Sequence, residues 1–160
     1  MSGPLLTPGF WGKLPAAGDF VARRLPPAFV DPWDRWVSRH LAPRLADGAL
    51  LCFATGSFTG VVAASADRTG RRFPLTLAAP LAGIAPAPWY AALADLAQAA
   101  AAGTLDPAAL DARLASLPAP AAEASAETLL LWSPGHPPEP TDPEAPEPVL
   151  ATLLTPTEAG

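Results

Sequence analysis

Four aspartates in the N-terminal half are the residues best suited to acid–base chemistry. Asp19, Asp31, Asp34 and Asp67 each carry a carboxyl group that could donate or accept a proton. Asp31 and Asp34 stand where we expect a helix to begin, and a carboxylate there caps free backbone N–H groups. Asp67 lies in a glycine-containing turn, where aspartate commonly hydrogen-bonds the backbone. A small hydrolase using Asp19 and Asp67 remains an alternative, and it predicts that both carboxylates share a cleft.

The segment Gly9–Leu14 has the outline of a phosphate-binding loop but fails its requirements. Such a loop places four residues between its first glycine and its Gly-Lys pair, and a Ser or Thr after the lysine binds magnesium. Here only two residues separate Gly9 from Gly12, and Leu14 follows Lys13. We therefore expect no nucleotide cofactor.

Histidine and cysteine are too few to build a metal centre. The chain contains only His40, His136 and Cys52, whereas a structural zinc site takes four ligands of these types. No Gly-x-Ser-x-Gly nucleophile motif is present. Cys52 lies in the apolar run Leu50–Phe53, which predicts a buried and unreactive thiol. A single cysteine fits a reducing compartment, so we expect a cytoplasmic protein without cofactors.

Charge divides the chain into two unlike halves. The formal net charge is −5; residues 1–72 carry nine Lys/Arg and five Asp/Glu, while residues 73–160 carry one and ten. An acidic chain lacks the basic surface that nucleic-acid binding requires, so we expect no nucleic-acid partner. The N-terminus lacks the pattern of a signal peptide, and no apolar stretch is long enough to span a bilayer. We therefore expect no membrane insertion.

Three short apolar segments predict an antiparallel sheet. Residues 50–54 and 58–64 are separated by a tight Thr-Gly-Ser turn, and residues 73–79 follow a polar loop. These connections are too short for crossover helices, so neighbouring strands must run antiparallel. Residues 9–15 and 128–132 have the composition of further strands.

Proline and aspartate mark the expected helix starts. Asp31 followed by Pro32 predicts a helix that Pro43 ends near residue 42. Pro88 opens a second helix that runs to Gly103, and Asp106 with Pro107 opens a third. Residues 133–148 are rich in Pro, Asp and Glu, which predicts an exposed loop without fixed structure, and residues 149–154 are expected to form a last strand or helical turn. We expect one domain over residues 1–160.

Three motifs occur in order and carry more detail than a core requires. They are Gly-Phe-Trp-Gly-Lys-Leu-Pro-Ala-Ala-Gly-Asp-Phe at residues 9–20, Leu-Pro-Pro-Ala-Phe-Val-Asp-Pro-Trp-Asp at 25–34, and Asp-Arg-Thr-Gly-Arg-Arg-Phe-Pro-Leu at 67–75. Together they resemble the TagF family of accessory proteins of bacterial type VI secretion systems. The resemblance implies an α-β-α sandwich around a mixed, largely antiparallel sheet. It also implies a non-catalytic, post-translational repressor of secretion that binds the forkhead-associated scaffold protein of that system.

Two groups of residues within these motifs have different expected roles. The aromatic side chains, including Phe20, are expected in the core. The charged residues have two open roles, bracing a turn or contacting a partner, because arginine is favoured in interfaces. Asp67 is expected to hold the turn, either by hydrogen-bonding the loop backbone or by pairing with Arg71. The candidate protein-binding residues are Lys13, Asp19, Asp67, Arg68, Arg71 and Arg72. Besides the hydrolase, a structural subunit of the secretion apparatus remains an alternative.

Overall fold

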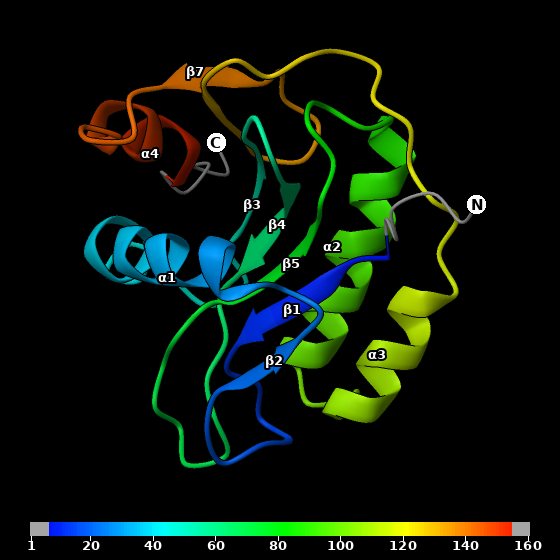
Figure 1. Cartoon of the computed structure of the whole chain (residues 1–160). Coiled ribbons are helices and arrows are strands. Elements are labelled where there is room, and N and C mark those ends of the chain that lie inside the picture. Colours follow the sequence, from blue (N-terminus) through cyan, green and yellow to red (C-terminus); the bar gives the residue numbers. More distant parts are fainter. Residues whose placement is uncertain (1–6, 155–160) are drawn as a thin grey trace.

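Seven strands form one sheet at the centre of the computed structural model, which describes residues 7–154 (Figure 1). Their order across the sheet is β2-β1-β5-β4-β3-β6-β7, and every neighbouring pair is antiparallel. The strands are β1 (Gly9–Gly12), β2 (Val21–Arg23), β3 (Leu50–Ala54), β4 (Thr59–Ala63), β5 (Leu75–Ala79), β6 (Leu129–Trp132) and β7 (Glu139–Thr141). The expected antiparallel trio is confirmed as the adjacent strands β3, β4 and β5.

The three central strands are buried on both faces, so the sheet separates two hydrophobic cores. Alternation along a strand sends neighbouring side chains to opposite faces. Cys52 and Val61 therefore belong to one core, whereas Phe53 and Val62 belong to the other. Continuous apolar runs are the pattern expected of strands covered on both sides.

Helices α2 (Ala87–Ala101) and α3 (Pro107–Ala115) cover one face of the sheet (Figure 1). The sequence predicts both correctly. Asp106 caps α3, since its Oδ1 accepts a hydrogen bond of 2.7 Å from the Ala109 N–H, and Pro107 takes the first helical position. Leu110 and Leu114 of α3 are fully buried.

The other face is covered by α1 (Pro27–Trp36), the π-helical turn η1 (Val37–Leu41) and α4 (Glu147–Leu154). The prediction that Asp31 caps this helix is wrong, because α1 begins one turn earlier. Pro27 takes the first helical position, where its missing N–H costs nothing, and Pro32 lies inside the helix. The expected end near residue 42 is confirmed by the Ala42 N–H, which bonds to the Val37 carbonyl at 2.8 Å.

The acidic segment 133–148 has more structure than its composition predicts. Residues 139–141 form β7, which pairs with β6 and buries Thr141, and α4 begins at residue 147. The prediction of a loop without fixed structure is therefore wrong, because β6 supplies an open sheet edge for this segment. Residues 149–154 form a helix that buries Leu150. Helices on both faces of the sheet confirm the α/β sandwich. Across residues 7–154, none of the helices has the length and apolar character needed to cross a membrane.

Candidate protein interaction site

Asp67 lies in the β4–β5 loop, at the centre of an ionic cluster. Its side chain is fully buried, and its Oδ2 lies 3.2 Å from Lys13 Nζ and 2.9 Å from Arg71 Nε. Its Oδ1 accepts hydrogen bonds from the Thr69 and Arg71 N–H groups and from Thr69 Oγ1, at 3.0, 3.0 and 2.7 Å. The expected pairing of Asp67 with Arg71 is confirmed. We call Lys13, Asp67, Thr69 and Arg71 the Asp67 cluster.

These contacts keep the Asp67 carboxylate charged. Burial alone would raise the pKa of this carboxyl, but the hydrogen bonds from Thr69, Arg71 and Lys13 outweigh burial and hold the pKa far below its usual range. A general base needs a pKa near the working pH and free access to a proton. Asp67 has neither, which argues against its use in a hydrolase.

The same loop is fastened to the β1–β2 connection by its arginines. Arg68 donates its backbone N–H to the Ala17 carbonyl and its guanidinium to the Ala16 carbonyl, both at 2.8 Å. Arg71 donates from Nη2 to the Gly18 carbonyl at 3.2 Å. Two loops that are about fifty residues apart in sequence therefore form one surface.

An aromatic group borders this surface. Phe20 stacks on Trp11 with ring centroids 5.6 Å apart, and Phe73 meets both rings edge-on at 5.1 Å. Lys13 Nζ lies 5.0 Å from the centre of the Phe20 ring. The prediction that Phe20 lies in the core is wrong, because 46% of this residue is exposed. Among residues 7–154, Phe20 is the one large hydrophobic residue that is exposed. Its position in a loop after Gly18 and Asp19 is the sequence signal that could have indicated exposure.

The six predicted site residues divide into three groups. Lys13, Asp67, Arg68 and Arg71 come together as described. Asp19 is exposed, its Oδ1 accepts the Phe20 N–H at 2.7 Å, and no ion pair within residues 7–154 involves it. Arg72 points away from the others, donating to Asp47 Oδ1 at 2.6 Å and to the Leu45 carbonyl at 2.9 Å.

Pairing between β1 and β5 brings the cluster together. Gly12 pairs with Leu75, so the residues that follow β1 and those that precede β5 lie next to each other at one end of these strands. Gly12 has a φ of 140°, and a Cβ at this position would collide with the Pro74 carbonyl. Glycine is therefore required for the close approach that places Lys13 beside Asp67.

The other candidate reactive groups, Cys52 and His40, are buried in the folded chain. Burial raises the pKa of the Cys52 thiol to about 12, so this cysteine is held as a thiol in the core. His40 is buried, with Nδ1 3.3 Å from Glu147 Oε1. Among the residues that the structure describes, no group of three or more His, Cys, Asp or Glu could hold a metal ion.

These features define an α/β sandwich protein whose arginines and aromatic rings form a braced surface. The chain matches the TagF N-terminal domain, a type VI secretion system-associated family, over residues 9–46 and 46–117. These matches cover more than half of the sequence, and the chain belongs to this family. It is therefore a type VI secretion-associated protein.

A solved structure is similar to this chain in sequence and fold. The crystal structure of PA0076 from Pseudomonas aeruginosa PAO1 is 33% identical to this chain, with a TM-score of 0.61. The similarity covers 71% of this chain and 64% of the PA0076 chain, so this chain spans somewhat less than two thirds of that protein's length. Comparison with curated proteins gives no match.

Proposed function

We propose that this protein is a non-catalytic, cytoplasmic repressor of type VI secretion that acts after translation by binding the forkhead-associated scaffold protein of the system. Membership of a type VI secretion-associated family supports the cellular process. The observation that carries the binding role is the exposure of Phe20, Arg68 and Arg71 on a braced double loop, which we call the Phe20 patch. The Arg71 side chain is 64% exposed although its Nε is fixed by Asp67.

The composition and rigidity of the Phe20 patch suit a binding surface. Arginine and aromatic residues are enriched in interfaces and dominate their binding energy. Side chains that are fixed before binding lose less conformational entropy when the complex forms. The Asp67 cluster fixes the conformation of the β4–β5 loop, and the exposed parts of the Arg68 and Arg71 guanidinium groups can contact a partner. An acidic surface on the scaffold is the complement that this patch predicts.

Substitution of the patch tests the proposal directly. Phe20→Ala and Arg68→Glu should each raise the Kd for the purified scaffold by about tenfold or more, because each removes an exposed anchor. In cells, both variants should release secretion from repression. Arg113→Glu on α3 is the matched control, since it reverses an exposed arginine away from the patch, and it should leave both measurements unchanged.

The same measurements separate repression from the alternatives. A structural subunit would remain in a stoichiometric complex with the assembled machine, and its removal would abolish secretion instead of increasing it. Unchanged scaffold affinity in both patch variants, with circular dichroism showing an intact fold, would contradict the proposed surface.

A further inference from the structure

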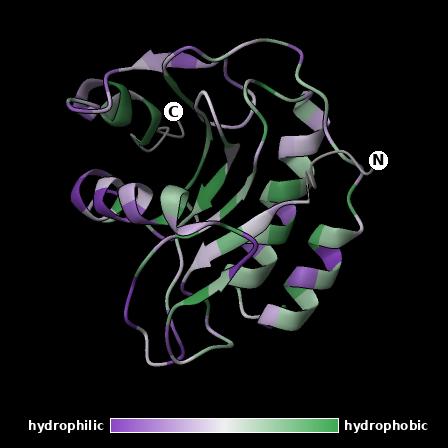
Figure 2. Cartoon of the chain, viewed as in Figure 1, coloured by the Kyte–Doolittle hydropathy of each residue, from purple (hydrophilic) through white to green (hydrophobic). Residues whose placement is uncertain are grey.

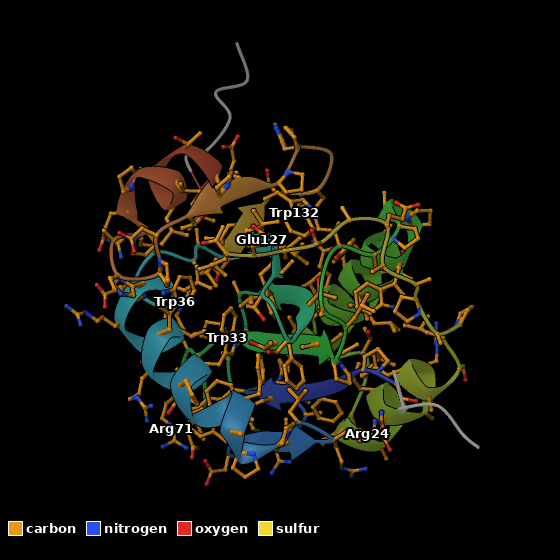
Figure 3. The ribbon with its side chains drawn as sticks, turned by 45° about the horizontal axis from the view of Figure 1, so that its top comes forward. Arg24, Trp33, Trp36, Arg71, Glu127 and Trp132 are labelled. Carbon is orange, nitrogen blue, oxygen red and sulfur yellow. The ribbon has the colours of Figure 1, made fainter. Side chains whose placement is uncertain are left out.

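A second surface lies between α1, the β3–β4 turn and the chain that connects β7 to α4. It is an open groove of about 530 Å³, within the range of about 300–1,000 Å³ that is usual for ligand sites. We call it the α1 groove. In Figure 3, Trp33 and Trp36 extend from α1 toward the interior of the molecule and β7. The lining of this groove includes Ala28, Phe29, Trp33 and Trp36 of α1, Phe58 of the β3–β4 turn, and Pro143.

The groove presents aromatic side chains, and several of its polar groups are already hydrogen-bonded within the protein. Trp33 Nε1 donates to Thr76 Oγ1 at 2.9 Å, and Trp36 Nε1 donates to the Pro143 carbonyl at 2.8 Å, so both indole N–H groups are occupied. Thr55 Oγ1 accepts the N–H groups of Ser57 and Phe58. An occupant would therefore gain by burying apolar surface and would find few hydrogen-bond partners.

The aromatic wall is held in place by contacts among its own rings. Phe29 stacks between Trp33 and the β3–β4 turn, with ring centroids 5.6 Å from Trp33 and 4.3 Å from Phe58. Trp33 also stacks on Trp36 and Phe53, at 5.2 and 4.4 Å. A groove that is already formed binds an apolar segment at a lower entropic cost than one that must assemble.

Charge around the groove selects the kind of occupant. The lining residue Pro143 is flanked in sequence by the exposed carboxylates Asp142 and Glu144. Asp31 and Asp34 of α1 lie on the other face of this helix, away from the groove. Figure 2 shows hydrophilic residues along β7, the strand that precedes this acidic segment. Complementary potentials favour a partner with positive charge.

We propose that the α1 groove is a peptide-binding site that takes an apolar protein segment flanked by lysine or arginine. This site is separate from the Phe20 patch, because its walls come from other elements and its charge has the opposite sign. The acidic segment that connects β7 to α4 forms one wall of the site through Pro143. The protein thus has one surface with exposed arginines and one flanked by carboxylates, and each suits a partner segment of the opposite charge.

Selection from a displayed library of short random peptides tests the site on the full chain. Ala28 is an exposed helical residue in the groove, so Ala28→Trp should fill it, and Ala91→Trp on α2 is the matched control outside it. We expect peptides with an apolar centre and basic flanks whose Kd rises about tenfold or more with Ala28→Trp and stays within about twofold with Ala91→Trp. Glu144→Lys should weaken the same peptides about threefold or more.

A second blocking variant keeps the test decisive. If Ala28→Trp fails to fold, Ser57→Trp at the exposed β3–β4 turn fills the groove from the other wall. The proposal is overturned if no selected peptide is sensitive to a blocking variant, or if the sensitive peptides carry acidic flanks. Displacement of every sensitive peptide by laurate, with no preference for basic flanks, would assign the groove to small apolar molecules and would also overturn it.

Discussion

At the residue scale, the charged carboxylate of Asp67 fixes the β4–β5 loop, which carries part of the proposed binding surface. Both of its oxygens are occupied by donors from Lys13, Thr69 and Arg71. The local part of this arrangement could be predicted from sequence, because Asp67, Thr69 and Arg71 lie within one turn. The contact with Lys13 could not, since it depends on the pairing of β1 with β5. The exposure of Phe20 differs from this contact, because its position in a loop after Gly18 and Asp19 could have indicated it from sequence.

Substitution of Asp67 should make stability respond differently to acid. Its pKa is lower in the folded chain than the value of about 3.9 expected when unfolded, so the unfolded chain binds the extra proton and stability falls as pH drops below about 4. Asp67→Asn lacks the titrating carboxyl and therefore lacks this pH-dependent contribution to the free energy of unfolding. The difference in unfolding free energy between the parent and Asp67→Asn should be constant above pH 5 and should narrow as pH falls toward 3, as measured by urea denaturation.

A control variant distinguishes this effect from general acid unfolding. Asp95→Asn removes an exposed carboxylate on α2, and its difference from the parent should stay small at neutral pH. A parent-to-Asp67→Asn difference that stays constant or widens between pH 7 and pH 3 would show that the folded chain does not hold Asp67 charged.

At the element scale, the sequence predicts helices and strands correctly where capping or turn residues mark their ends. It fails for elements whose structure depends on pairing or packing with another element. The Asp106–Pro107 pair fixes the start of α3, and the turn at residues 55–57 fixes the β3–β4 hairpin. At α1, several prolines compete for the first helical position, and the apolar face beginning at Phe29 favours the earlier one. β7 has three residues including a proline, so only its pairing with β6 makes it a strand.

Trp36 is expected to hold the β7–α4 connection against α1. Trp36→Phe keeps an aromatic ring in the wall and removes the N–H that donates to the Pro143 carbonyl. Loss of one such hydrogen bond costs about 1 kcal/mol, which corresponds to about fivefold faster amide exchange if the segment opens locally. Hydrogen exchange measured by mass spectrometry should show this increase in residues 139–147. Unchanged exchange there, or an equal increase throughout the chain, would contradict a local fastening role.

At the scale of the whole molecule, one sheet joins two cores that share no helix. Each central strand contributes alternate side chains to both cores, so disruption of a strand is felt on both faces. The proposed binding surfaces are positioned by this shared sheet. The Phe20 patch lies where β1 ends and β5 begins, and the α1 groove is lined by the β3–β4 turn and by Leu129 of β6. We therefore expect the two layers to unfold together.

Leu93→Ala tests this coupling from the layer formed by α2 and α3. Leu93 of α2 is fully buried in the core beneath α2 and α3, and its truncation should cost about 2–5 kcal/mol by leaving a cavity. With fluorine-labelled tryptophan, the signals of Trp89 in this core and Trp33 in the other should lose their native shifts at the same urea concentration, lowered equally from the parent midpoint. An early transition of Trp89 while Trp33 keeps its native signal would mean that the sheet does not couple the layers. In that case, the α1 groove would survive damage to α2. Coupled loss instead follows from side chains that alternate across strands shared by both cores.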